Sequence, residues 1–138
     1  MKQIVVLGGG ISGYGSAILA KKKGFGVFLS DAGRIADRYK AKLDEWEVPY
    51  EEGGHSEERI LAATEVVKSP GIPDTAPIVC KIREAGIPVI SEMEFAGRYM
   101  GKARCICITG SNGKTTTTSL IYKIMRDAGM NVAGRTLQ

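Results

Sequence analysis

Cysteine and histidine are scarce in this sequence, which has three cysteines and one histidine in 138 residues. So small and odd a cysteine count argues against a disulfide framework and predicts a chain from a reducing, cytoplasmic compartment. Cys105 and Cys107 alternate within an apolar run and should share one face of a strand as buried thiols. Only His55 could join them as a ligand, and it lies in the polar segment EEGGHSEE, where we expect a solvated loop residue. We therefore expect no metal site built from cysteine and histidine.

Long apolar runs are also absent. The opening MKQIVVLGGGISGYGSAILAKKKG begins like a signal peptide, but glycines at 8, 9, 10, 13 and 15 interrupt it. No run approaches the roughly 18 apolar residues of a membrane helix, so no membrane insertion is expected. Charge of one sign does not dominate either. The chain carries 19 Lys and Arg against 15 Asp and Glu, a net +4 with the signs interspersed, and we expect no nucleic-acid partner.

The hydrophobic share of 43% and the charged share of 25% predict a globular chain with a real core. Short β-rich runs alternate with segments of helical character, which predicts a Rossmann-like parallel sheet with helices on both faces, an α/β fold. Strands are expected at 4–7, 27–30, 65–68, 88–90 and 105–109, and helices at 16–23, 35–46, 77–85, 93–100 and 115–128.

The alternation starts anew after the basic, glycine-containing stretch RYMGKAR. We therefore expect a Rossmann-like domain at 1–93, a linker at 94–103 and the truncated start of a second domain at 104–138. One strand and one helix cannot bury a core of their own, so the chain is expected to be a fragment. Its helix carries Leu120, Ile121, Ile124 and Met125 as one apolar stripe, which should pack on the first domain or on a second copy of the chain, giving a possible homodimer.

The first glycine loop follows the strand at 4–7. Gly8, Gly10 and Gly13 satisfy G-x-G-x-x-G, a pattern that lets backbone approach a pyrophosphate at a helix N-terminus. Asp31 ends the next strand, where an acidic residue often meets a ribose hydroxyl. A second loop, SPGIP, follows the strand at 65–68 at the same sheet edge. In it Pro70 stiffens the chain and Gly71 permits close approach of a ligand, although a structural turn would need the same residues.

The third loop, TGSNGKTTT, lacks the first glycine of a full Walker A pattern, since Ile108 stands in its place. The residues that carry the chemistry remain. Backbone amides from Gly110 to Lys114 can wrap an anion, the Lys114 ammonium can reach β and γ phosphates, and the Thr115 hydroxyl can hold Mg²⁺. Residues 104–138 therefore look like the first strand-loop-helix unit of a P-loop ATPase domain.

TGSNGKTTT resembles the shortened phosphate loop of the Mur ligase family, ATP-dependent amide-forming enzymes of peptidoglycan synthesis. GGGISG, SPGIP and SEMEFA resemble the branch that joins D-glutamate to UDP-N-acetylmuramoyl-L-alanine, and the match covers nearly the whole chain. The resemblance implies three partners, which are that UDP sugar, D-glutamate and ATP with Mg²⁺. It also implies transfer of the γ-phosphoryl group to the substrate carboxylate, giving an acyl phosphate that the amine of D-glutamate attacks.

The resemblance also implies two sets of site residues. The uridine diphosphate would lie on Gly10, Ile11, Ser12, Gly13, Asp31, Arg34, Ser69, Pro70 and Gly71. ATP would lie on Gly110, Ser111, Asn112, Gly113, Lys114, Thr115 and Thr116, with Lys114 and Thr115 catalytic and Thr115 on Mg²⁺.

The sequence departs from the family pattern in two places. Ala32 and Gly33 come between Asp31 and Arg34, at a position where the family places residues that contact uracil. The ending AGRTLQ replaces a glycine-asparagine turn. Two other interpretations stay open, a pyridine-nucleotide or flavin domain, which would leave TGSNGKTTT unexplained, and a non-enzymatic nucleotide sensor.

Overall fold

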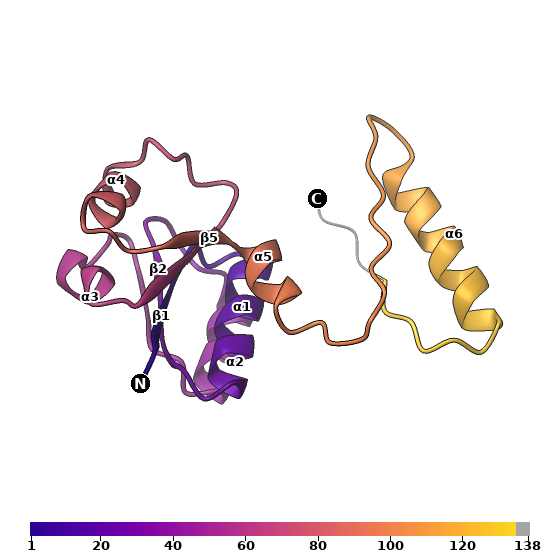
Figure 1. Ribbon diagram of the computed structural model, residues 1–138, viewed down its shortest axis with the longest axis horizontal. Helices are drawn as coiled ribbons and strands as arrows, with labels where there is room; N and C mark the ends of the chain where they lie inside the picture. The colour runs from indigo at the N-terminus through magenta and orange to yellow at the C-terminus, as the bar shows by residue number, and fades with distance from the viewer. Residues whose placement is uncertain (135–138) are drawn as a thin grey trace. The chain divides into compact units, whose positions relative to one another are not determined.

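A computed structural model describes residues 1–134 of the chain (Figure 1). The chain divides into two compact units, Met1–Gly101 and Lys102–Gln138. The closing residues RTLQ, which belong to the second departure from the family pattern, lie outside the described range. Among the described helices, the longest of which has 14 residues, none is long and apolar enough to cross a membrane.

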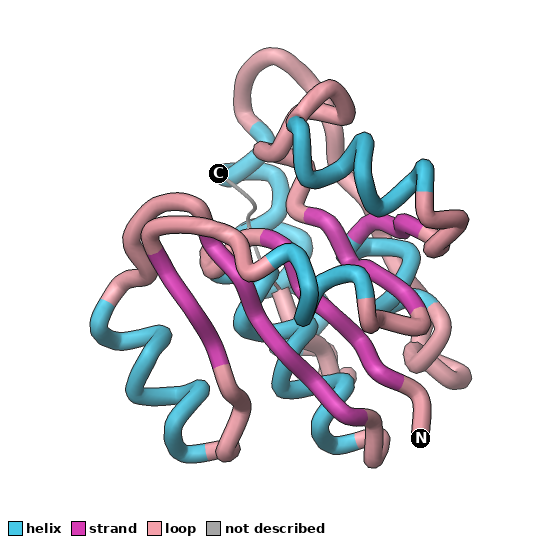
Figure 2. The backbone as a smooth tube through the Cα atoms, turned by 90° about the vertical axis from the view of Figure 1, so that its left-hand side faces the viewer, coloured by secondary structure: helices cyan, strands magenta, loops and turns pink. Residues whose placement is uncertain are grey.

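The first unit is built on one parallel sheet of five strands in the order β3-β2-β1-β4-β5 (Figure 2). β1 is central and pairs in parallel with β2 and β4. Because β1 connects to β2 on one side while β4 lies on the other, the strand order reverses beside β1, which is where open α/β sheets bind ligands. The strands are β1 Gln3–Leu7, β2 Gly26–Asp31, β3 Tyr50–Glu52, β4 Glu65–Lys68 and β5 Val89–Ser91.

Helices cover both faces of this sheet, as predicted (Figure 1). Alternate residues of β1 point to opposite faces, so Ile4 and Val6 enter one apolar cluster while Val5 and Leu7 enter the other. The first cluster receives side chains from α1, α2 and α5, and the second from α3 and α4. The helices are α1 Ile11–Lys22, α2 Asp37–Glu45, α3 Glu57–Leu61, α4 Pro77–Glu84 and α5 Glu92–Gly97.

Two elements of the first unit were not predicted. β3 and α3 span three and five residues, both inside or beside the polar stretch that we took for a loop. β3 pairs only with β2 and is at most half-buried, so it lacks the apolar run that marks the inner strands. The remaining strands and helices of this unit lie where they were predicted, with ends shifted by up to five residues. The largest shift is at the start of α1, which begins at Ile11 rather than at residue 16.

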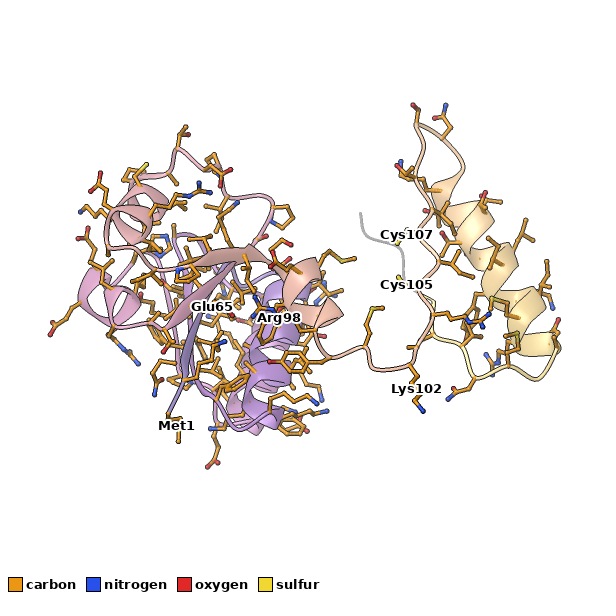
Figure 3. All side chains as sticks on the ribbon, viewed as in Figure 1. Met1, Glu65, Arg98, Lys102, Cys105 and Cys107 are labelled. Atoms are coloured by element: carbon orange, nitrogen blue, oxygen red, sulfur yellow. The ribbon has the colours of Figure 1, made fainter. Side chains whose placement is uncertain are left out.

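Helix α5, which was predicted at 93–100, extends into the segment 94–103 that we expected to be a linker. Its Phe95 is fully buried in the first core cluster. Just beyond the helix, Arg98 Nη1 donates to Glu65 Oε1 at 2.7 Å, which ties this stretch to β4 (Figure 3). We therefore propose that the boundary between the domains lies near Gly101, where the first compact unit ends.

The second unit, as far as the structure describes it, contains one helix, α6 Lys114–Asp127, and an extended segment before it. The predicted strand at 105–109 is not formed in the described residues, because no neighbouring strand is there to pair with it. The prediction of buried thiols was also wrong. Cys105 and Cys107 are exposed, although their sulfurs lie on one side of the segment, 3.6 Å apart (Figure 3).

The apolar stripe of α6 divides into two parts. Ile121 and Met125 help line a small cavity of about 120 Å³ between the helix and the extended segments on either side of it. Leu120 and Ile124 lie outside that cavity and are 56% and 66% exposed. Only two of the four residues of the stripe therefore line the cavity of this unit.

Candidate nucleotide-binding site

The first glycine loop joins β1 to α1 and holds its shape through two glycines. Gly8 has φ +100°, and a Cβ there would lie 2.8 Å from Ser69 Cβ. A Cβ on Gly13 would lie 1.8 Å from the Gly8 carbonyl oxygen, so only glycine lets α1 begin this close to β1. These glycines are required by the chain's own packing.

Gly10 differs from its neighbours. It is the N-cap of α1 with φ −73° and ψ −172°, a conformation open to any residue, and its side chain position meets nothing within 4 Å. The first intrahelical hydrogen bond runs from Tyr14 N to Gly10 O at 3.0 Å, so the amides of Ile11, Ser12 and Gly13 precede it. The open space over Gly10 and the positive end of the helix suit an approaching anion.

Asp31, at the end of β2, ties two loops together. Its Oδ2 accepts from Gly9 N at 2.6 Å, and its Oδ1 accepts from Gly33 N at 2.8 Å. Both carboxylate oxygens thus already hold backbone amides, although each keeps capacity for one more hydrogen bond. Arg34 lies close by in sequence but is 79% exposed and faces Asp37, with 3.7 Å between Nη2 and Oδ1.

The SPGIP loop continues from β4 and is anchored by backbone hydrogen bonds and one lysine. Ser69 N donates to Leu7 O at 3.0 Å, which fixes the loop beside the end of β1. Lys68 Nζ donates to Ile72 O at 2.6 Å and to Ser69 O at 3.3 Å, so that one ammonium group joins the two ends of the loop. The loop is therefore a fixed wall at the sheet edge.

These loops surround a cavity of about 580 Å³ at the carboxyl edge of the sheet. A cavity of this size fits a small-molecule ligand. Four of the predicted residues line it, namely Gly10, Asp31, Ser69 and Gly71, whereas Ile11, Ser12, Gly13, Arg34 and Pro70 do not. Of the other lining residues, Gly8, Ile72 and Pro73 belong to the two predicted loops, and Ala32 follows Asp31. The lining residues that no motif indicated are His55, Glu57, Ala76, Pro77 and Ile78.

His55 is the most informative of the residues that were missed. We expected a solvated loop residue, but the ring is half-buried and lines the cavity. Its Nδ1 lies 2.7 Å from the Oγ of Ser30, a fully buried side chain at the end of β2. Ser30 Oγ in turn donates to Glu51 Oε1 at 2.7 Å. Only the pairing of β3 with β2, in which Ser30 faces Glu51, brings these groups together.

Glu92 places a buried carboxylate near the start of α1. It is 7% exposed, and its Oε1 has no hydrogen-bond partner among the described residues. Burial raises the pKa of Glu92, while the nearby Ser12 hydroxyl and the Lys68 ammonium oppose the rise. Glu92 is also the first residue of α5, a position at which the helix dipole favours a negative charge.

The TGSNGKTTT loop of the second unit, the predicted phosphate loop, is a turn closed by Lys114. Gly110 and Gly113 have φ +152° and +77°, and Gly113 caps α6 without any side-chain hydrogen bond. Lys114 Nζ donates to Gly110 O across the loop, and Thr118 Oγ1 donates to Lys114 O at 2.7 Å. Ser111, Asn112, Thr115 and Thr116, with the loop glycines and Lys114, are all exposed. The predicted phosphate-binding residues thus lie together on one turn.

The fold and these loops define a Rossmann-like domain with a glycine turn after β1, followed by a second glycine-containing turn that leads into α6. Both parts of the chain match known protein families. The N-terminal domain of MurD-like Mur ligases matches residues 2–91, and the Mur ligase middle domain matches residues 108–137. The chain belongs to the Mur ligase family.

Known relatives share most of this chain. It is 63% identical over 132 residues to a Bacteroides fragilis protein and 56% identical over 129 residues to a Porphyromonas gingivalis protein, both named UDP-N-acetylmuramoylalanine--D-glutamate ligase. These alignments cover 96% and 94% of this chain but only 30% and 28% of the relatives. Among solved structures, a murein peptide ligase from Psychrobacter arcticus matches with a TM-score of 0.71 at 27% identity, over 94% of this chain and 27% of that one.

Proposed function

We propose that the chain is the N-terminal part of an ATP-dependent ligase that adds D-glutamate to UDP-N-acetylmuramoyl-L-alanine. The observation that carries the proposal is the cavity of about 580 Å³ in which the glycine loop, Asp31 and the SPGIP loop converge. The names of the close relatives support the same reaction. Because the reaction consumes ATP, we place it in the cytoplasm.

In the first unit, the uridine diphosphate would lie along the carboxyl edge of the sheet. The open face of Gly10 and the amides of Ile11, Ser12 and Gly13 would receive the diphosphate, since they form the positive end of α1. Ser69 and Gly71 would face the nucleoside from the opposite wall, with Pro70 stiffening their loop. Asp31 would hold the glycine loop in shape and could accept a further hydrogen bond from a ribose hydroxyl. Arg34 remains a candidate contact of the uracil from the rim.

In the second unit, the turn from Gly110 to Thr116 would hold the phosphates of ATP. The residues fit this role, because the N-cap lacks a competing side chain and the Lys114 ammonium already spans the loop. Thr115 exposes its hydroxyl in the first turn of α6, where it could contribute one ligand to Mg²⁺. A bound Mg²⁺ would neutralise charge on the transferred phosphoryl group. Lys114 would add a fixed positive charge at the same group.

Titration calorimetry on the 138-residue chain tests this function. UDP-N-acetylmuramoyl-L-alanine should bind, and NADH should not, because a dinucleotide domain would show the reverse preference. Tight NADH binding without binding of the UDP sugar would contradict the proposal. ATP in a parallel titration reports separately on the loop of the second unit.

A further inference from the structure

The hydrogen-bond chain from Glu51 through Ser30 to His55 fixes where the imidazole proton lies. Glu51 also accepts from Ser56 N at 2.7 Å and from Ser56 Oγ at 2.5 Å. Burial acts to raise the pKa of Glu51, but the hydrogen bonds from Ser56 and Ser30, with the charge of Arg59, lower it below the usual value. Glu51 is therefore an ionised carboxylate, which can only accept hydrogen bonds.

Ser30 has one hydroxyl proton, which Glu51 Oε1 at 2.7 Å receives in preference to the Gly54 carbonyl oxygen at 3.4 Å. The Ser30 oxygen can then only accept from His55 Nδ1, which lies at the same distance of 2.7 Å. The neutral imidazole must carry its proton on Nδ1, so that Nε2 becomes a hydrogen-bond acceptor. Among the described residues Nε2 has no hydrogen-bond partner.

The ring is also held in place by its backbone. Gly53 N donates to Gly33 O at 2.8 Å, and Gly54 N donates to Asp31 O at 3.4 Å. These bonds tie the loop before His55 to the loop after β2, which itself lines the cavity through Asp31 and Ala32. The imidazole is therefore a fixed acceptor at the cavity wall.

The other groups of the cavity indicate which part of a nucleotide would meet this acceptor. The N-terminal end of α1 at Gly10 suits the phosphates. A hydrogen-bond acceptor such as Nε2 has no proton to donate to a phosphate oxygen. Ile72, Pro73 and Ile78 supply an apolar wall on which a flat base could lie. A uracil ring has one strong donor, its imide N3–H, whereas N3 of cytosine is an acceptor.

We propose that His55 reads the base of the substrate, accepting a hydrogen bond from uracil N3–H on Nε2, with Ser30 and Glu51 as positioning residues. The proposal rests on the proposed function, since it assumes that a uridine nucleotide occupies the cavity.

The test compares UDP with CDP and with N3-methyl-UDP by calorimetry, on the parent chain and on His55→Phe. Phenylalanine keeps a ring of similar size but removes both nitrogens. The parent should prefer UDP to CDP by about tenfold or more, because CDP would leave the acceptor unpaired. His55→Phe should weaken UDP about tenfold and leave CDP and N3-methyl-UDP unchanged, so that the preference disappears.

Two further variants separate recognition from folding. His55→Gln, which can still present an acceptor, should recover part of the UDP preference. Ser30→Ala should reduce the preference, because it frees the imidazole to protonate on either nitrogen. Equal losses of UDP and CDP in His55→Phe, or an unchanged preference, would overturn the role of His55 alone. A parent chain that binds neither UDP nor CDP would overturn the proposed function as well.

Discussion

The substitution Gly10→Val tests whether Gly10 is needed for ligand binding rather than for the fold. The backbone angles at Gly10 are open to valine, and the new Cβ would meet nothing within 4 Å. The substitution should therefore cost stability only through the weaker N-cap, about 1 kcal/mol. It would, however, place a branched side chain over the amides that are proposed to receive the diphosphate.

The expected loss of affinity follows from those amides. Losing two hydrogen bonds to a charged phosphate costs roughly 1.5–3 kcal/mol each, or about 3–6 kcal/mol together. Since each 1.4 kcal/mol is tenfold, UDP binding should weaken on the order of 10² to 10⁴-fold. Titration calorimetry with UDP measures this, and thermal unfolding followed by circular dichroism measures stability.

Two other glycines of the same segment supply controls. Gly15 also has open space at its side chain position, but it lies inside α1, so Gly15→Val should leave UDP binding unchanged. Gly13→Ala should instead prevent correct folding, because its Cβ would lie 1.8 Å from the Gly8 oxygen. If Gly10→Val bound UDP as tightly as the parent chain, the assignment of this loop to the diphosphate would be refuted.

Three other predictions concern Lys114, Glu92 and α6. In a full-length parent enzyme, Lys114→Ala should lower the ligase rate on the order of 10² to 10³-fold, and a rate within threefold of the parent would contradict its role. Glu92→Gln should stabilise the chain at pH 7 and have little effect below the ordinary glutamate pKa of 4.5, as denaturant unfolding at the two pH values can show. The 138-residue chain should dimerise through exposed Leu120 and Ile124 of α6, whereas a monomer by light scattering, or a dimer unaffected by Leu120→Lys with Ile124→Lys, would count against this.

The sign of the Glu92 prediction follows from proton binding. Burial raises the pKa of the folded-state carboxyl above its unfolded value, so the folded chain binds more protons between the two pKa values. Stability therefore falls as the pH rises from 4.5 through the folded-state pKa, and the penalty persists at neutral pH. Because glutamine does not titrate, the stability of the Glu92→Gln variant should not fall in this way as the pH rises. A variant that is less stable than the parent at pH 7 would show that the ionised carboxylate stabilises the fold.

The inner strands could be predicted because burial on both faces leaves a continuous apolar run. Ile4 to Leu7 and Val66 to Val67 are at most 2% exposed, and their sequence shows it directly. The outer strand β3 could not be predicted, since it has three residues, is half-exposed and carries two glutamates. Edge strands depend on pairing with a neighbour rather than on their own pattern. His55 was missed for the same reason, because its contact with Ser30 exists only once β3 lies beside β2.

The strand expected at 105–109 failed for the opposite reason. Its alternating apolar residues favour a strand, but a strand is stable only with a hydrogen-bonded partner, and the described part of the second unit contains none. Ile106 is consequently 56% exposed. The helix beside it formed as predicted, since the hydrogen bonds of a helix lie within its own segment.

Asp31 has a structural role in addition to the ligand contact that its motif predicts. The position at the end of β2 predicts an acidic residue that contacts the ligand, and Asp31 does line the cavity. Yet its two oxygens hold the amides of Gly9 and Gly33, one on each of two neighbouring loops. Without this carboxylate, the buried Gly9 amide would lose its acceptor and the glycine loop would lose its tie to β2. The residue is therefore needed to shape the site before any ligand arrives, and a contact with the ribose would add to that role rather than replace it.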